Sequence, residues 1–263
     1  MNVLPPPAVS GAAYDEPYYL GACIGYGEWR ASDGEQMSGR YPGVLALAGL
    51  RAGETLVDIG AGRGELIVCA GELGANAIGI DYSEAALALA KQTLAAHGNP
   101  AGVRILAADA RALPLEDACA DLVTMLDVIE HLTDAEQATA MVEVRRILRP
   151  GGRVLIHTMP NRLIYDITYR LQRAWHPGRR GWPRDPRNDY ERQMHVGEQT
   201  RRSLRARLIA ADLVEVDVRH GEMVYTDHVP DPRAHATYHR LAAHRMTRKF
   251  GRNDLWAWAV KAG

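Results

Sequence analysis

Four aspartates each follow a short apolar run in the first half of the chain. They are Asp58, Asp81, Asp109 and Asp127. The apolar runs alternate with helical patterns, which indicates parallel strands whose carboxyl ends share one edge of a sheet. Ligands bind at that edge in such sheets. The sequence therefore predicts a ligand site that four carboxylates surround.

A glycine-rich segment, DIGAGRGE, begins at the first of these aspartates and ends at Glu65. Glycine at every second position lets the backbone turn sharply and lets a ligand approach the peptide groups. The spacing is GxGxG rather than the dinucleotide spacing GxGxxG. Asp58 just before the glycines would repel a diphosphate and attract an ammonium group. These features predict a nucleoside ligand with a cationic tail.

The next two aspartates fit the rest of such a nucleoside. Asp81 lies 17 residues after Gly64, where a carboxylate at a strand end can accept both ribose hydroxyls. Asp109 is placed to accept a hydrogen bond from an adenine amino group. Ala110 offers its backbone amide to a ring nitrogen.

A second group of polar residues, Asp127-Val128-Ile129-Glu130-His131, follows the fourth predicted strand. Asp127, Glu130 and His131 are three and four residues apart, so one helical turn would place them on one side. A histidine near pH 7 can take a proton from a substrate hydroxyl. His131 is therefore our first candidate for a general base, and His195 is a second candidate.

The elements that must position these residues follow from the hydrophobic pattern. An α/β protein is indicated by five strands at 55–58, 77–81, 103–108, 121–126 and 153–158, with helices at 65–73, 83–97 and 133–148 between them. Ser83 and the sequence Thr133-Asp134-Ala135-Glu136 are typical helix starts. Later in the chain we expect helical residues at 161–175, a loop at 176–192, a helix at 200–211 and strands at 213–218 and 255–260.

Four segments in this order resemble the class I S-adenosylmethionine-dependent methyltransferases. VDIGAGRGEL is similar to the first motif of that family, GIDYSEAALALA to the second, AADARALPLEDACADLVTMLDVIEHL to the adenine and fourth-strand region, and LRPGGRVLIHT to the fifth strand. The resemblance covers about residues 41–160 strongly and the later strands more loosely. It implies a seven-stranded, Rossmann-like sheet that is mostly parallel, with an antiparallel edge strand and with N-terminal and post-fifth-strand cap segments.

The resemblance also implies S-adenosylmethionine as the cofactor and a division of the chain. We expect an aromatic-rich N-terminal cap at 1–40, a cofactor-binding core at 41–160, a substrate-cap insertion at 161–200, and a C-terminal part of the sheet at 201–263 with a lid or dimer segment at 219–254. The expected cofactor-binding residues are Asp58, Gly60, Ala61, Gly62, Gly64, Asp81, Tyr82, Asp109, Ala110 and Asp127. The expected substrate-binding residues are Tyr26, Tyr165, Tyr169 and Trp182.

Charge is unevenly divided along the chain. Residues 1–160 have a net charge of −9, whereas residues 161–263 have +8. Arginines and aromatic residues alternate in the expected substrate cap, which suits an acceptor with an anionic group. We expect methylation of a small molecule, at a hydroxyl of a sugar or secondary metabolite, as in natural product biosynthesis. Alternatives are small-molecule N- or C-methylation and a cofactor-binding regulatory subunit without turnover.

Metal-dependent methylation of an RNA 2′-hydroxyl is a further alternative. Asp127, Glu130, His131 and His195 could together bind a divalent cation, and the set resembles the metal site of small-RNA 3′-end 2′-O-methyltransferases. We assign no metal ligand from the sequence, because the first position would hold Asp127 where those enzymes have Glu.

Composition excludes several other classes of protein. The chain has 263 residues, 47% hydrophobic and 24% charged, which is ordinary globular usage. It shows neither an apolar run long enough for a membrane span nor a secretory signal. Its three cysteines form no CxxC pair, so we expect a reduced, cytoplasmic protein. We expect a monomer or homodimer with neither nucleic acid nor a membrane as partner.

Overall fold

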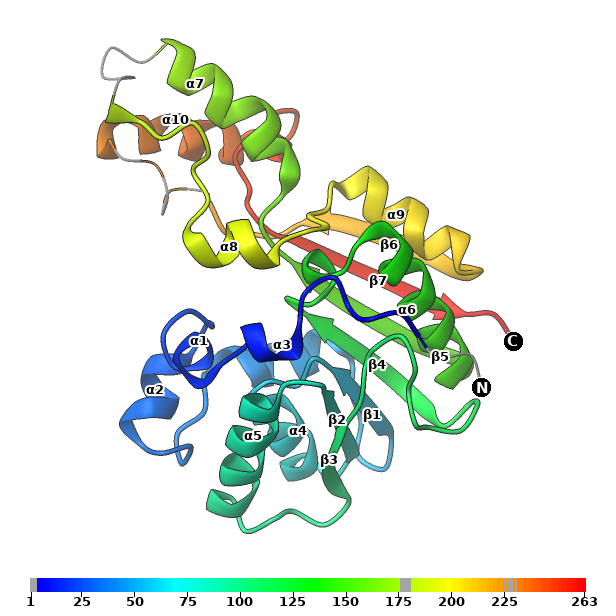
Figure 1. Ribbon diagram of the computed structural model, residues 1–263. Helices are drawn as coiled ribbons and strands as arrows, with labels where there is room; N and C mark the ends of the chain where they lie inside the picture. The colour runs from blue at the N-terminus through cyan, green and yellow to red at the C-terminus, as the bar shows by residue number, and fades with distance from the viewer. Residues whose placement is uncertain (1–3, 176–180, 225, 227–228, 230) are drawn as a thin grey trace.

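The computed structural model describes residues 4–175, 181–224, 226, 229 and 231–263. One seven-stranded sheet with the order β3-β2-β1-β4-β5-β7-β6 runs through the molecule (Figure 1). The strands are β1 (Thr55–Ile59), β2 (Asn76–Asp81), β3 (Val103–Ala107), β4 (Ala120–Leu126), β5 (Leu148–Thr158), β6 (Leu213–His220) and β7 (Leu255–Lys261). Strands β1 to β5 pair in parallel, and β7 is antiparallel to both β5 and β6. The predicted seven-stranded, mostly parallel sheet is confirmed, and its antiparallel strand, β7, lies next to the edge strand β6.

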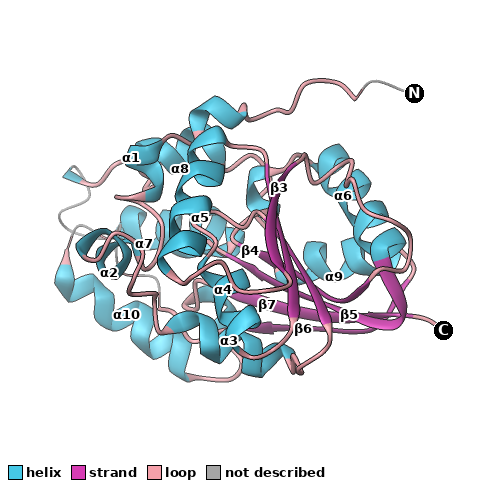
Figure 2. Cartoon of the chain, turned by 90° about the horizontal axis from the view of Figure 1, so that it is seen from below, coloured by secondary structure: helices cyan, strands magenta, loops and turns pink. Residues whose placement is uncertain are grey.

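Helices cover both faces of the sheet because successive strand residues point to opposite sides. Helices α3 (Arg40–Ala48), α4 (Glu65–Glu72) and α5 (Glu84–Ala96) bury one face against Leu56 and Leu122. Helices α6 (Asp134–Ile147) and α9 (Arg201–Ala210) bury the other face against Val57 and Val123. Figure 2 shows these helices around the magenta strands.

Helix starts match the sequence signals. The hydroxyl of Ser83 accepts a hydrogen bond from the amide of Ala86, so Ser83 is the N-cap of α5. Thr133 and Glu136 form a reciprocal capping box at the start of α6. Both caps satisfy amides that otherwise have no partner in the first helical turn. Their effect is to fix where the chain leaves the carboxyl ends of β2 and β4.

The N-terminal segment forms short helices beside α5. They are η1 (Gly11–Ala13), α1 (Glu16–Tyr19) and α2 (Tyr26–Ala31). Trp29 is buried and donates a hydrogen bond through Nε1 to the hydroxyl of Thr93, at 2.8 Å. Tyr14 and Tyr19 pack in the same cluster with Leu89 of α5. The aromatic residues of this segment therefore attach it to the core.

A separate apolar cluster holds together the segments that follow β5 and β6. It contains η3 (Ile164–Tyr169) and α10 (Pro232–Ala243), with Trp182 between them. Helix α7 (Arg170–Trp175) continues η3. The short helix η5 (Arg248–Phe250) packs against η3. We call residues 161–175, 181–187 and 231–252 the cap unit; Figure 1 shows it projecting beyond one end of the sheet.

Two expectations about local structure need correction. Residues 189–194 form α8 (Asp189–Met194) rather than part of a loop, because Asn188 and Glu191 make a capping box. Strand β5 begins at Leu148, five residues before the expected start, and pairs with Ala120 across an irregularity in the register. The residues after β4 form only a short helix, η2 (Ile129–His131). Within the described residues, no helix is long and apolar enough to cross a membrane.

Candidate active site

One cavity opens at the carboxyl ends of the parallel strands, where the sequence predicted a ligand site. All four strand-end aspartates, Asp58, Asp81, Asp109 and Asp127, line it. So do Gly60, Ala61, Gly62, Tyr82, Ala110, His131 and His195 from the predicted site. The polar residues of the first and second motifs therefore meet in a single space.

The glycine-rich loop forms one wall of this cavity. Gly60 has a φ of 75°, and a Cβ on it would lie 2.3 Å from a methyl carbon of Val128. Gly62 also has a positive φ, and its amide donates to the carboxylate of Asp81. Gly64 contacts Ala90 of α5 and is not among the residues that line the cavity. The loop thus needs Gly60 and Gly62 for the ligand wall, whereas Gly64 serves the close packing of α4 on α5.

Asp58 is a buried carboxylate without an ion-pair partner among the described residues. Its side chain accepts a hydrogen bond from Thr124 at 2.7 Å. Burial, with a smaller contribution from the nearby Asp81, raises the pKa of Asp58 to about 7. A ligand ammonium group beside Asp58 would favour the ionised carboxylate. This orphaned acid fits the cationic tail that the sequence predicted.

Asp81 and Asp109 present carboxylate oxygens in different settings. Asp81 accepts hydrogen bonds from the amides of Ser83 and Gly62, which orient it at the end of β2. Burial raises the pKa of Asp81 above its ordinary value. Asp109 is bound by the guanidinium of Arg111, with a shortest distance of 2.7 Å. Asp81 is therefore open to a hydroxyl donor, while Asp109 has a neutralising partner.

Asp127 belongs to a charged network with Arg40 and His157, and it is not part of the cluster that Glu130, His131 and His195 form. Its carboxylate lies 2.9 Å from Nη1 of Arg40 and 2.5 Å from Nδ1 of His157. Burial disfavours the ionised form, but His157 and Arg40 together hold the pKa of Asp127 below its usual range. Burial lowers the pKa of His157, but Asp127 outweighs it and the pKa is about 9. The expectation that Asp127 shares one side of a turn with Glu130 and His131 is wrong, because Asp127 adopts a φ of 57°.

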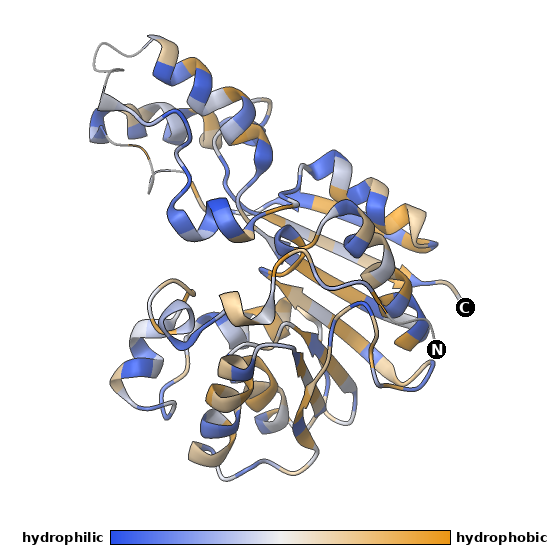
Figure 3. Cartoon of the chain, in the orientation of Figure 1, coloured by the Kyte–Doolittle hydropathy of each residue, from blue (hydrophilic) through white to orange (hydrophobic). Residues whose placement is uncertain are grey.

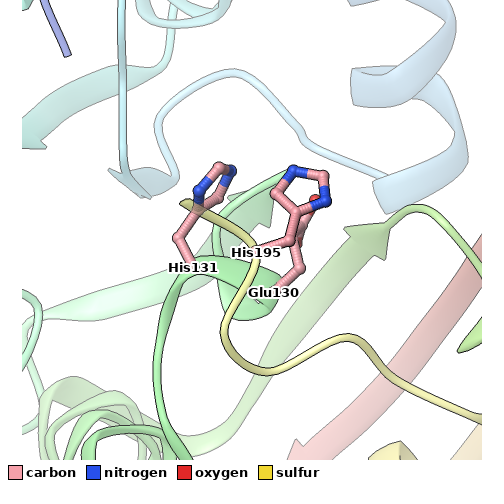
Figure 4. A group of neighbouring side chains, drawn as sticks. All are labelled: Glu130, His131 and His195. Carbon is pink, nitrogen blue, oxygen red and sulfur yellow. The ribbon is translucent and has the colours of Figure 1, made fainter. Parts of the chain in front are cut away.

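Glu130, His131 and His195 come together in this cavity (Figure 4). One ligand atom from each lies within 4.8 Å of the others. Nδ1 of both histidines is buried and has no hydrogen-bond partner among the described residues. Burial and the neighbouring His195 lower the pKa of His131 to about 3, and burial also lowers the pKa of His195. Both rings are therefore neutral and offer lone pairs.

Glu130, like Asp58 and Asp81, has no ion-pair partner in the described chain, unlike Asp109 and Asp127. It accepts a hydrogen bond from the hydroxyl of Thr158 at 2.8 Å. Burial, with a contribution from Asp127, raises its pKa to about 8. The site thus holds three carboxyl groups with raised pKa values: Asp58, Asp81 and Glu130.

The predicted substrate-binding residues lie elsewhere. Tyr26 begins α2 with 39% of its surface exposed. Tyr165, Tyr169 and Trp182 are buried in the apolar cluster of the cap unit. None of the four lines the cavity in the described part of the chain. The aromatic residues that do line it are Tyr14, Tyr18, Tyr19, Tyr41, Tyr82 and Tyr190.

Three arginines of the site were not predicted. Arg40 binds Asp127, and Arg111 binds both Asp109 and Glu136. Arg63, inside the glycine-rich motif, donates to the carbonyl oxygens of Tyr19 and Ile24 and so ties the N-terminal segment to the loop. The position of Arg63 inside the glycine-rich motif could have indicated that it belongs to the site. Nothing in the local sequence marks Arg40, because its partner is 87 residues away.

Comparison with known proteins identifies a family for the region that contains the glycine-rich loop and the strand-end aspartates. Residues 57–156 match the model of a methyltransferase domain. The ubiquinone biosynthesis O-methyltransferase of Cupriavidus pinatubonensis is 34% identical over 179 residues, which cover 66% of each chain. The chain belongs to the class I S-adenosylmethionine-dependent methyltransferases.

Other methyltransferases show the same relation over different lengths. The demethylmenaquinone methyltransferase of Thermus thermophilus is 35% identical over 119 residues, 44% of this chain and 52% of the relative. The matched region thus spans about half the length of that relative. Phosphoethanolamine N-methyltransferase 2 of Haemonchus contortus, solved with S-adenosyl-L-methionine, has a TM-score of 0.61 at 18% identity, over 96% of this chain and 57% of that one. This structural likeness shows the fold.

Proposed function

We propose that the protein transfers a methyl group from S-adenosylmethionine to a hydroxyl of a small molecule. The observation that carries the proposal is the placement of two neutral histidines, the buried His131 and the half-buried His195, in the same cavity as the strand-end carboxylates. His131 and His195 each have an Nδ1 atom without a partner among the described residues. An acceptor hydroxyl between them and the cofactor would find a hydrogen-bond acceptor already in place.

Three of the strand-end carboxylates are assigned to the cofactor in this proposal. Asp58 holds the ammonium of the methionine moiety, Asp81 the ribose hydroxyls and Asp109 the adenine amino group. Gly60, Ala61 and Gly62 provide the close backbone wall, and Ala110 provides an amide. Bound S-adenosylmethionine supplies an electrophilic methyl group. What the protein adds is alignment of the acceptor with that methyl group and exclusion of water.

A histidine with a low pKa is sufficient for the proton transfer. Methylation of a neutral hydroxyl gives a protonated ether, which is a strong acid. His131 can therefore take the proton as the new carbon–oxygen bond forms, although its pKa is about 3. The ring of His195 lies 4.8 Å from the ring of His131 between centroids, and it offers a second nitrogen that can accept the hydroxyl proton.

The experiment that tests this function uses methyl-labelled S-adenosylmethionine and small-molecule extract from the source cells. We expect a labelled product with an O-methyl group, identified by mass spectrometry. The variant H131Q should bind the cofactor normally and form the product more slowly. A sugar or secondary metabolite is our expected acceptor. Label found only on nitrogen or carbon would refute O-methylation, and no label in any fraction would favour a regulatory subunit.

Metal-assisted transfer is a second candidate, favoured by the arrangement of Glu130, His131 and His195. Two imidazoles and a carboxylate suit a divalent cation, which would bind the acceptor oxygen and lower its pKa. The four-residue set considered from the sequence does not assemble, because Asp127 pairs with Arg40 and His157. Activity that EDTA removes and Mg²⁺ or Mn²⁺ restores would select this candidate. Activity that EDTA leaves unchanged would exclude it.

A further inference from the structure

An apolar stripe runs along the outside of the cap unit, away from the candidate active site. Ile167, Leu171 and Trp175 are four residues apart, so they lie on one side of η3 and α7. Their exposed fractions are 38%, 57% and 85%. The opposite side of the same helix, with Ile164 and Tyr169, is buried in the apolar cluster. One apolar side of this helical segment is therefore packed in the cluster, and a second apolar side, the stripe, is exposed.

Positive charge surrounds this stripe. The residues of the cap unit include eleven Lys or Arg and three acidic residues. Arg162 and Arg170 are exposed on the helix itself. The turn that contains η5 packs against η3. Arg248 and Lys249 are exposed in this turn, and the exposed fraction of Met246 is 79%. The excess of positive charge in the second half of the chain is thus concentrated in the unit that carries the stripe.

We propose that this face of the cap unit docks on an anionic membrane surface. A helix with a protruding apolar side and flanking arginines can insert its apolar residues at the level of the headgroups while the arginines bind lipid phosphates. A tryptophan at the end of the stripe suits that interface. Figure 3 shows hydrophobic and hydrophilic residues alternating along α7 at the outer end of the molecule.

The aromatic residues of the cap unit argue for lipid rather than single-stranded nucleic acid. Nucleic-acid grooves use exposed aromatic faces on which bases stack. Tyr165, Tyr169 and Trp182 are instead buried, with exposed fractions of 9%, 0% and 5%. The stripe exposes two aliphatic side chains and a single aromatic ring, that of Trp175, rather than the series of aromatic faces on which bases stack. Docking of this kind needs no membrane-spanning helix, and it does not depend on the proposed methyl transfer.

The test is sedimentation of the full-length protein with vesicles of phosphatidylcholine, with and without phosphatidylglycerol. We expect binding only to the vesicles that contain phosphatidylglycerol, and loss of that binding at high salt. The double variant L171S/W175S should weaken binding about tenfold or more, since it removes the two most exposed apolar side chains of the stripe. The matched control is V142S, on α6, because Val142 is 61% exposed and lies outside the cap unit.

Cofactor binding measured in solution shows whether each variant is folded. Equal binding to both kinds of vesicle, no binding to either, or equal loss in V142S would overturn the proposal. Binding of RNA that competes with the vesicles and is weakened by L171S/W175S would also overturn it in favour of a nucleic-acid surface. A dimer that V142S retains and L171S/W175S abolishes would identify a second copy of the chain as the occupant instead.

Discussion

The raised pKa of Asp58 predicts that cofactor binding depends on pH in a specific way. The carboxyl has a pKa of about 7 in the folded chain, because it is buried and lies near Asp81. The ammonium of the cofactor should bind only the ionised form. At pH 5, about two units below this pKa, roughly one molecule in a hundred has an ionised Asp58. The Kd for S-adenosylmethionine should therefore rise about tenfold per pH unit below pH 7, and level off above pH 8.

Isothermal titration calorimetry between pH 5 and pH 8 measures this dependence. The variant D58N keeps the shape of the side chain and the partner hydroxyl of Thr124, but removes the titrating group. It should bind the cofactor weakly and with little change across the range. The reasoning is refuted if the wild-type Kd is constant from pH 5 to pH 8, or if D58N shows the same slope.

Folding stability should change in the opposite direction, which separates binding from unfolding. The unfolded value of the Asp58 pKa is near the ordinary 3.8, and the folded value is about 7. Between these values the folded chain binds more protons than the unfolded chain, so the free energy of unfolding that Asp58 contributes falls as pH rises. Thermal melts of wild type and D58N should show that D58N loses this part of the pH dependence.

Three other variants test the site. D81A should weaken cofactor binding by more than about 1.5 kcal/mol, since it removes a buried charged acceptor; unchanged affinity in calorimetry would contradict the ribose assignment. H131Q should lower kcat by about a hundredfold with the cofactor Kd unchanged, as expected for a group that moves a proton; an unchanged kcat would contradict the base assignment. G60A should prevent cofactor binding, because its Cβ would lie 2.3 Å from Val128. Adding V128A should restore binding only in part, because the positive φ still costs about 1 kcal/mol or more, and full recovery would show that this φ imposes no strain.

Sequence was sufficient for the parts of the molecule where local patterns decide the structure. The strand-end aspartates Asp58 and Asp81 followed from apolar runs and the glycine spacing, and both line the cavity. Ser83 and Thr133 followed from capping chemistry, and both cap helices. These signals are short in range, so a single sequence contains them.

Contacts between distant residues could not be predicted in this way. Asp127 turned toward Arg40 and His157, and those partners lie 87 and 30 residues away. Tyr165 and Tyr169 were expected at the substrate because aromatic residues alternate with arginines there. They pack instead against α10, a helix more than 60 residues later, since that cluster gives the cap unit its own core.

The most direct test of the account is a crystal structure of the protein with S-adenosylhomocysteine. The account predicts the ammonium at Asp58, the ribose hydroxyls at Asp81, the adenine amino group at Asp109, and the sulfur facing the side of the cavity that holds His131 and His195. A cofactor bound away from the strand-end aspartates, or one whose sulfur points away from both histidines, would contradict it.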